Sequence, residues 1–462
     1  MDVLLIAPAS GPWHHVGRTR WFNGKTFRFS LLSLLTVAAE TPRDVRVEIV
    51  DEQIDDIPWE GNWDLIGITC MTAAAPRAYE IARRFRRRGV PVVLGGMHPT
   101  FLPDEALEHA DAVCVGDAEG VWARIVRDAL AGRLAPIYRS EGPARLAGLE
   151  PLPRHLVPKR HYGTVQAVQA TRGCPHRCAF CAVSAFHDGR FKRRPVGEVV
   201  AEIAALPERF FIFVDDSLTA DPEYARELFR ALRPLGKRWF SQATLGFADD
   251  VELVRTAAAS GCIGLFVGLE TFSERNLVTV DKGFNRVEDY RERIEVLHAH
   301  GIGVEAGIVF GFDPDDRGVF RRTLEHLDEL EIDMVQASVL TPLPGTPYYD
   351  RMRARIFDHD WSHYDYHRVV FEPRRMSAEE LQAGHDWVTR EFYRPRRIAR
   401  RLARIAGRRR GWRYLPFAAA INGAYFGRVA RWKIAGRDPS IVDSSSRRGR
   451  SALRPEKQRT AA

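Results

Sequence analysis

The segment Thr171-Arg172-Gly173-Cys174-Pro175-His176-Arg177-Cys178-Ala179-Phe180-Cys181 decides how the rest of the chain is interpreted. It places three of the six cysteines of this 462-residue chain within eight residues, in the spacing C-x3-C-x2-C. So few cysteines, clustered in this way, indicate a metal site rather than a disulfide framework. Three thiolates suit a [4Fe–4S] cluster with one iron left open, because a fourth protein ligand would close it. Structural zinc is the alternative, but it usually takes two separated cysteine pairs, and His176 lies awkwardly between two of the cysteines.

The cysteine segment follows the first strand of a series in which strands and helices alternate. The expected strands are 165–170, 210–214, 238–242, 264–269, 303–310 and 333–340. Helical patterns lie between them, for example at 224–233, 251–259, 287–300 and 319–330. Six β/α units at this spacing predict a partial (β/α)6 barrel over residues 165–370, with its active site at the carboxyl ends of the strands.

Residues 1–138 predict a separate α/β domain. Strands are expected at 3–7, 45–50, 65–69, 90–94 and 112–115, with helices at 30–40, 74–88, 104–110 and 121–130. Short apolar strands alternating with helices are typical of a doubly wound parallel sheet, in which ligands bind beyond the carboxyl ends of the strands. A stretch with several prolines, residues 139–164, is expected to be the linker to the barrel.

The C-terminal region is predicted to be helical and basic over residues 371–435, with a disordered basic tail at 436–462. From Arg390 onward there are 21 Lys/Arg and 4 Asp/Glu, whereas the preceding residues carry 47 and 56. The positive charge therefore belongs to this region alone, and we expect no nucleic-acid binding by the protein as a whole.

A helix around residues 397–405 of this region would place Ile398, Leu402 and Ile405 on one face, with arginines on the others. This pattern suits either an anionic membrane surface or an ordinary helix packed on the barrel. RNA is a third option, but no RNA-binding module accompanies the arginines.

The sequence contains no uninterrupted apolar run long enough for a membrane span and no signal peptide at its start. We therefore expect a cytoplasmic protein, and the C-terminal helix raises the hypothesis of a peripheral contact with the inner face of the membrane.

The motif C-x3-C-x-aromatic-C after the first barrel strand resembles that of the radical S-adenosylmethionine (SAM) superfamily. The resemblance implies that Cys174, Cys178 and Cys181 hold the cluster, that SAM binds the open iron, and that its reductive cleavage yields a 5′-deoxyadenosyl radical. Further motifs resemble those of the family at the strand ends. They imply SAM contacts from the following residues: Phe180, Asp216, Ser217, Gln242, Glu270, Gly307 and Gly311.

The N-terminal region resembles the cobalamin-binding domain of a large radical SAM group, on the motifs Gly95-Gly96-Met97-His98-Pro99-Thr100 and Gly116-Asp117-Ala118-Glu119. The implied cobalamin contacts are Thr69, Thr72, Gly95, Gly96, His98, Gly116 and Glu119. The D-x-H-x-x-G pattern, whose histidine ligates cobalt in other cobalamin proteins, is absent, as it is from many members of this group. A domain that keeps the fold but has lost the cofactor is the alternative.

With both cofactors, the resemblance implies methylation of an unactivated carbon by way of methylcobalamin. A radical SAM cyclase, oxidase or other rearrangement enzyme is the alternative, and the motifs do not separate these outcomes or assign a catalytic residue. A cobalamin-binding module without enzymatic activity is a third hypothesis, against which the cysteine segment argues. Similarity of the C-terminal segments to hopanoid methylases raises a polycyclic lipid as one substrate. Flavodoxin or ferredoxin is the expected electron donor.

Overall fold

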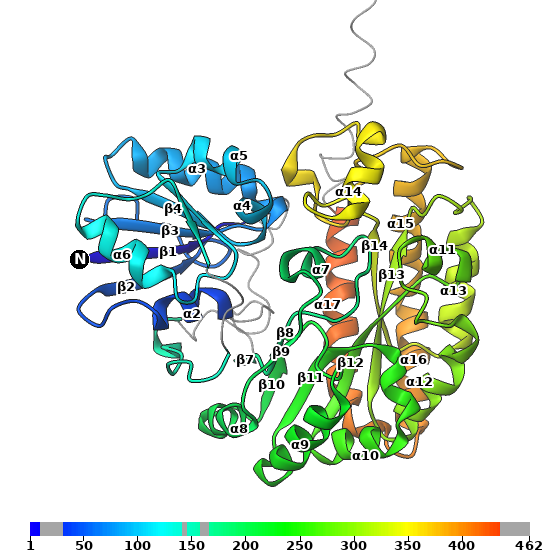
Figure 1. Ribbon diagram of the computed structural model, residues 1–462. Helices are drawn as coiled ribbons and strands as arrows, with labels where there is room; N and C mark the ends of the chain where they lie inside the picture. The colour runs from blue at the N-terminus through cyan, green and yellow to red at the C-terminus, as the bar shows by residue number, and fades with distance from the viewer. Residues whose placement is uncertain (10–30, 141–145, 158–165, 435–462) are drawn as a thin grey trace, which may run out of the picture.

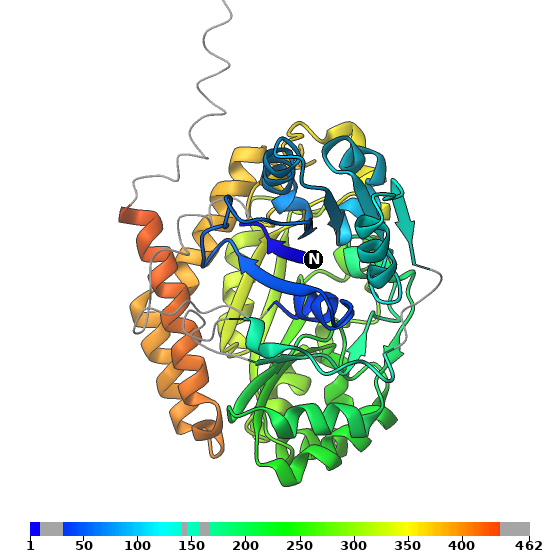
Figure 2. The same cartoon turned by 90° about the vertical axis from the view of Figure 1, so that its left-hand side faces the viewer.

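Two parallel β-sheets, each accompanied by helices, form the two halves of the molecule and lie side by side (Figure 1). The structure is a computed structural model that describes residues 1–9, 31–140, 146–157 and 166–434. In Figure 2 the N-terminal sheet faces the viewer and the larger C-terminal half lies behind it.

The N-terminal sheet has six parallel strands in the order β2-β1-β3-β4-β5-β6. The strands are β1 (Asp2–Ala7), β2 (Arg46–Asp51), β3 (Leu65–Thr69), β4 (Val92–Gly95), β5 (Ala112–Val115) and β6 (Ile137–Arg139). The helices are α2 (Leu32–Ala39), α3 (Ala75–Arg86), α4 (Met97–Phe101), α5 (Pro103–His109) and α6 (Trp122–Leu130).

Strand β1 shows why this sheet is covered on both faces. Val3 and Leu5 belong to the apolar core on one face, whereas Leu4 and Ile6 belong to the core on the other. A strand buried on both faces has an uninterrupted apolar sequence, as β1 has. The strand order reverses at β1, since β2 and β3 pair with its opposite edges. Such a reversal opens a crevice at the carboxyl ends of the two strands.

The second sheet has six parallel strands in the order β7-β10-β11-β12-β13-β14, and β7 and β14 are its unjoined edges. The strands are β7 (Gln166–Val168), β10 (Phe210–Phe213), β11 (Arg238–Ala243), β12 (Cys262–Glu270), β13 (Gly303–Phe310) and β14 (Met334–Val339). The helices between the strands are α7 (Ala182–His187), α8 (Val196–Ala205), α9 (Pro222–Leu232), α10 (Val251–Ala259), α11 (Glu274–Thr279), α12 (Tyr290–Ala299) and α13 (Val319–Glu329).

The architecture predicted from the sequence is confirmed: a doubly wound sheet, a partial six-stranded barrel and a helical C-terminal region. The sequence did not predict β6, the short helix α4 or the hairpin of β8 (Thr171–Arg172) and β9 (Lys192–Arg193). The helix predicted at 30–40 is α2, although residue 30 lies outside the described residues. The domain boundaries at 138, 164, 370 and 435 stay a prediction, and the tail at 436–462 lies outside the described residues.

After α14 (Pro347–Met352), three C-terminal helices pack against the second sheet: α15 (Ala378–Phe392), α16 (Pro395–Gly407) and α17 (Leu415–Ile434). Arg401 of α16 is only 2% exposed and donates to the carbonyl of Phe392 and to Oδ1 of Asn422, each at 2.8 Å. Burial lowers the pKa of Arg401 to about 10. This arginine therefore joins helices inside the protein.

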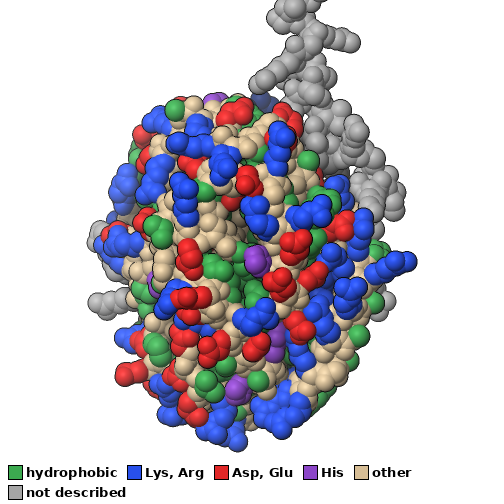
Figure 3. Space-filling view, turned by 90° about the vertical axis from the view of Figure 1, so that its right-hand side faces the viewer, with side chains coloured by type: hydrophobic (Ala, Val, Ile, Leu, Met, Phe, Trp, Pro, Cys, Tyr) green, Lys and Arg blue, Asp and Glu red, His purple; other side chains and the backbone are tan. Residues whose placement is uncertain are grey.

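The apolar side chains of α16 also face inward. Ile405 is 1% exposed, and Ile398 and Leu402 pack against the same C-terminal and barrel cores. This arrangement corresponds to the alternative of an ordinary helix packed on the barrel, so α16 gives the membrane hypothesis no support. Basic and acidic side chains are interspersed over the face shown in Figure 3. None of the described helices has the length and apolar composition needed to cross a bilayer.

Glu305 is an isolated acid within the second sheet. It lies on β13, is 8% exposed, and Oε1 accepts a hydrogen bond from the hydroxyl of Tyr425 of α17 at 3.3 Å, its one such partner among the described residues. Burial raises its pKa to about 7 from an ordinary value of 4.5. The folded protein therefore holds a proton on Glu305 over a pH range in which the unfolded chain has lost it.

We expect Glu305→Gln to stabilise the protein at pH 8 but not near pH 4.5. Between pH 4.5 and 7 the unfolded carboxyl ionises first, so the stability of the wild-type protein falls with rising pH and stays lower above pH 7. Glutamine does not ionise, so the variant avoids this loss. Its free energy of unfolding at pH 8 should exceed that of the wild type by about 2–3 kcal/mol. Melting temperatures from pH 5 to 8 provide the measurement. Glu288→Gln, at a 65% exposed side chain, is the matched control, and a stabilisation that does not change with pH would contradict the assignment.

Candidate functional site

The cysteine segment forms a loop between β8 and α7, at the carboxyl end of the second sheet. Cys174 and Cys181 are partly exposed, Cys178 is 8% exposed, and Cys181 is the residue that precedes the first turn of α7. Burial raises the pKa of Cys178 to about 12 and also raises that of Cys174. The thiols of Cys174 and Cys178 therefore stay protonated until a metal displaces the protons, as is usual for cysteine ligands.

Two aspartates at the end of β10 fix the start of this loop. The buried Asp215 carboxylate accepts hydrogen bonds from the backbone N–H of Ala170 at 3.1 Å and from the backbone N–H and the hydroxyl of Thr171. Asp216 accepts from the N–H of Gly173 at 2.9 Å. The residues just before Cys174 are thus held by side chains from the neighbouring strand.

The middle of the loop is held by the other strand ends. The N–H of Ala179 donates to the carbonyl of Val280, and its carbonyl accepts from the N–H of Tyr348 of α14, both at 3.0 Å. The ring of His176 stacks on Phe284, with centroids 3.8 Å apart. His176 therefore packs against the connection between α11 and α12, and the hypothesis that it completes a zinc site has no support from this placement.

A buried ion pair lies beside the cysteines. Glu270 at the end of β12 pairs with Lys282, and the two side chains are 10% and 12% exposed. Burial alone would lower the pKa of Lys282, but Glu270 and Cys178 raise it above its ordinary value. Glu270 has a positive φ of 65°, and an added Cβ on Gly268 would lie 2.3 Å from its carboxylate. The sequence predicted Glu270 as a site residue but gave no signal for Lys282.

The other predicted SAM residues fall into two groups. Phe180 packs half-buried on the barrel core, Gln242 is exposed, and Ser217 is buried with no hydrogen-bond partner for Oγ among the described residues. The glycines, in contrast, are in contact with protein side chains. An added Cβ on Gly307 would lie 2.7 Å from the Phe266 ring, and one on Gly311 would meet Leu381 and Phe371. The assignment of all five residues as SAM contacts stays a prediction.

No three Cys, His, Asp or Glu side chains of the described residues lie close enough together to hold a single metal ion. Zinc would require thiolates roughly 4 Å apart, given metal–sulfur bonds of about 2.3 Å. The three cysteines nevertheless share one environment, since Cys174 and Cys181 both influence the pKa of Cys178. Three cysteines on one short loop are a donor set that suits an iron–sulfur cluster.

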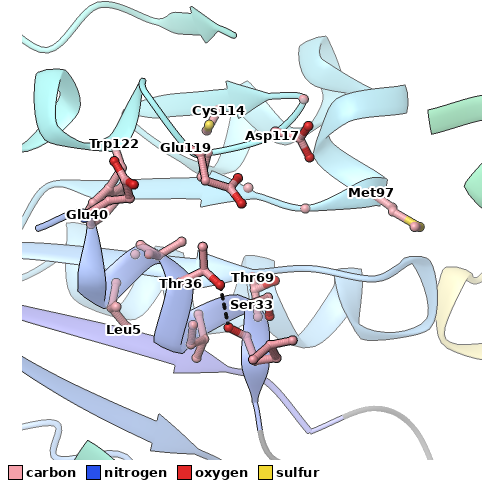
Figure 4. Close-up of a pocket in the computed structure, with 18 of the residues that line it drawn as sticks. Leu5, Ser33, Thr36, Glu40, Thr69, Met97, Cys114, Asp117, Glu119 and Trp122 are labelled. Carbon is pink, nitrogen blue, oxygen red and sulfur yellow. Dashed lines mark hydrogen bonds between the residues drawn. The ribbon is translucent and has the colours of Figure 1, made fainter. Parts of the chain in front are cut away.

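A cavity of about 350 Å³ lies beyond the carboxyl ends of β1, β3, β4 and β5, at the point where the strand order reverses. Its lining includes Leu5, Gly67 and Trp122, and α2 and the residue that follows it contribute Ser33, Thr36 and Glu40 (Figure 4). Thr36 of α2 and Glu119 of the loop after β5 point into the space between these elements. The C-terminal half of the molecule closes the cavity through residues of α7, of β8 and of the segments after β7 and β10: Gln169, Arg172, Phe186, His187, Val214 and Asp216.

Five of the seven residues predicted to contact cobalamin line this cavity: Thr69, Gly95, Gly96, Gly116 and Glu119. Gly96 has a φ of 101°, and an added Cβ would lie 2.9 Å from the carbonyl oxygen of Cys70. Glycine is therefore required where the chain turns at the cavity wall. Sequence reasoning missed the contribution of α2 and of the second sheet, because neither carries a local motif.

His98 and Thr72 are not among the lining residues of the cavity. His98 is fully buried, and Nε2 lies 3.0 Å from the hydroxyl of Tyr79 and 3.3 Å from Glu105. Trp361 donates to the same glutamate at 3.0 Å and meets the His98 ring edge-on. The structure therefore places the His98 side chain in a contact between distant segments, and its assignment as a cobalamin contact stays a prediction.

The donor set and the cavity fit the groups that the sequence implied. The three cysteines are the side chains that would hold an iron–sulfur cluster, and glycines at the strand ends leave room for a large ligand above the first sheet. The two sites adjoin, because Arg172 and His187, which flank the cysteine loop, also line the cavity.

We expect Asp215→Ala to prevent stable cluster assembly. The substitution leaves two backbone N–H groups and one hydroxyl without their buried acceptor, at a cost of about 3 kcal/mol or more. Iron per chain after anaerobic reconstitution, measured with the melting temperature, checks this expectation. Asp188→Asn removes a 68% exposed acid near the same loop and is expected to change neither quantity. Full iron occupancy in Asp215→Ala would contradict the conclusion that Asp215 holds the cysteine loop in place for the cluster.

Comparison with known proteins identifies both halves of the chain. Residues 168–327 match the Radical SAM superfamily, and residues 37–126 match the B12 binding domain. The bacteriochlorophyllide d C-12(1)-methyltransferase of Chlorobaculum tepidum is 31% identical over 80% of this chain and 84% of its own length. The hopanoid C-2 methylase of Rhodopseudomonas palustris is 24% identical over 77% of this chain and 68% of its own.

A relative with a different reaction also matches. The anaerobic magnesium-protoporphyrin IX monomethyl ester cyclase of Cereibacter sphaeroides is 26% identical over 71% of this chain and 60% of its own. Among solved structures, the radical SAM methyltransferase TsrM of Kitasatospora setae, with cobalamin and a [4Fe–4S] cluster bound, has the same fold. It aligns with a TM-score of 0.61 at 18% identity, over 76% of this chain and 77% of that one.

The cofactors of this enzyme are a [4Fe–4S] cluster, SAM and cobalamin, as the two matched domains and the geometry of the cysteine loop and the cavity indicate. The chain belongs to the group of radical SAM enzymes that carry a B12-binding domain ahead of the radical SAM domain.

Proposed function

We propose that this enzyme methylates an unactivated carbon of its substrate by way of methylcobalamin. The observation that carries the proposal is that the cluster loop and the cavity share residues. Arg172 lies two positions before Cys174, and α7 begins directly after Cys181 and ends at His187 in the cavity wall. Six helical residues span about 9 Å, so a group in the cavity lies close to the cluster.

The cluster and SAM supply a radical that removes a hydrogen atom, and cobalamin supplies the methyl group. The chain's own residues position these reactants. The strand-end contacts hold the cysteine loop, the glycines leave space for cobalamin, and the buried Glu270–Lys282 pair presents charge beside the cysteines. Enclosure between the two sheets would keep water and oxygen from the reacting carbon.

The names of the relatives suggest a substrate class. A bacteriochlorophyllide, a hopanoid and a magnesium-protoporphyrin ester are all large, mainly apolar ring systems. We extend this class to the present enzyme, with flavodoxin or ferredoxin as the proposed electron donor. The cytoplasmic location stays a prediction, and a peripheral membrane contact forms no part of the proposal.

The second candidate is a radical SAM cyclase or oxidase, which the similarity to the cyclase of Cereibacter sphaeroides favours. The two candidates differ in one reaction that needs no substrate. A methylating enzyme transfers the methyl group of SAM to reduced cobalamin, whereas a cyclase need not.

We expect the anaerobically reconstituted enzyme to form CD3-cobalamin from CD3-labelled SAM, cobalamin and a reductant, and to form 5′-deoxyadenosine. Gly95→Phe should abolish CD3-cobalamin but retain iron and deoxyadenosine, because its ring fills the cavity without backbone strain. Cys181→Ala should abolish deoxyadenosine. Mass spectrometry of both products provides the measurement.

The matched controls are Gly197→Phe, where nothing lies within 4 Å of an added Cβ, and Cys262→Ala, at a buried cysteine away from the loop. Deoxyadenosine without any CD3-cobalamin in the wild-type enzyme would favour the cyclase or oxidase. Bacteriochlorophyllide d is the first probe substrate, and a mass increase by one CD3 group would support both the reaction and the substrate class.

A further inference from the structure

The hairpin β8–β9 places two cations directly opposite each other. Each strand has two residues, and Arg172 pairs with Lys192 in antiparallel register. Opposed side chains in such a pair lie on the same face, and like charges in this position repel. A hairpin this short has little stability of its own. The two opposed cations therefore require negative charge from another part of the molecule.

The counter-charge comes from the B12-binding half of the molecule. Arg172 lies 3.2 Å from Asp117 and 2.7 Å from Glu119, and Lys192 lies 3.1 Å from Asp117. All four side chains are between 11% and 15% exposed. Arg172 also donates to Oε1 of Gln169 at 3.0 Å. Two cations from one half and two anions from the other therefore form a largely buried group, which we call the interdomain ion group.

The interdomain ion group connects the two cofactor sites by a short path. Asp117 and Glu119 lie on the loop after β5 that forms a wall of the cavity, next to Gly116. Arg172 precedes Cys174 by two residues, and the intervening Gly173 is fixed by Asp216. Gly173 has a φ of 81°, and an added Cβ would lie 2.1 Å from the carbonyl of Arg190, so this close approach of the turn to the residues before β9 requires glycine.

We infer that Arg172 is a positioning residue that sets the distance between the cobalamin and the iron–sulfur cluster. A guanidinium reaches two carboxylates at once in a fixed geometry, which the single ammonium of a lysine does not. This inference rests on the binding of both cofactors, but it does not depend on whether the reaction is a methylation or a cyclisation.

The test measures that distance directly. Cob(II)alamin and a reduced [4Fe–4S] cluster each carry an unpaired electron spin, so their dipolar coupling can be followed by pulsed EPR of the loaded full-length enzyme. We expect one narrow distance distribution in the wild-type enzyme. Arg172→Gln should broaden or shift it and weaken cobalamin binding on the order of tenfold. Arg172→Lys should give an intermediate distribution.

Arg190→Gln is the matched control, because this 58% exposed arginine lies on the α7–β9 connection but pairs with an exposed acid. Its distribution should equal that of the wild type. If Arg172→Gln loses iron or cobalamin, Glu119→Gln replaces it, since Arg172 then keeps Asp117 while one contact of the group is lost. A smaller broadening is expected there.

An unchanged, narrow distribution in a fully loaded Arg172→Gln or Glu119→Gln variant would overturn the inference and leave the proposed function intact. Absence of bound cobalamin from the reconstituted wild-type enzyme would instead count against the proposed function. Arg172→Gln combined with Asp117→Asn and Glu119→Gln provides an internal check. If the ion group acts as a unit, the combined variant should be no worse than Arg172→Gln alone.

Discussion

The structure depends on the way a loop with almost no secondary structure is held still by the ends of its neighbouring strands. The carboxylate of Asp215, fully buried just after β10, accepts hydrogen bonds from the backbone N–H groups of Ala170 and Thr171. A buried carboxylate without a cation is costly, and burial raises the pKa of Asp215 to about 7. These hydrogen bonds offset part of that cost. The start of the loop that carries the cysteines is thus fixed before any metal contributes.

Much of the fold could be predicted from the sequence, because its signals are local. Apolar runs such as residues 3–7 predict strands buried on both faces, and the cysteine spacing predicts a metal site wherever the chain places it. Five of the seven residues assigned to cobalamin line the cavity for a similar reason. Glycines at the ends of parallel strands lie at one edge of the sheet whatever their other neighbours are.

The residues that could not be predicted depend on partners far along the chain. His98 belongs to the motif that predicts cobalamin contacts, but no local pattern indicates the buried network that its side chain forms with Tyr79, Glu105 and Trp361. Lys282 becomes notable only through its contact with Glu270. The basic helix α16 suited either a membrane surface or packing on the barrel, and its sequence did not indicate that Arg401 donates to Phe392 and Asn422 inside the protein. In each case the residue type marks the position as notable, but contacts with residues far along the chain decide where the side chain points.

Helix α7 has only six residues, and a helix of that length does not hold its shape alone in water. One end follows Cys181, and the other contributes Phe186 and His187 to the cavity. Oxidative loss of the iron would therefore release the anchored end of this helix and, with it, part of the wall around the corrinoid. Oxygen damage at the cluster would therefore also disturb the second cofactor site, through α7.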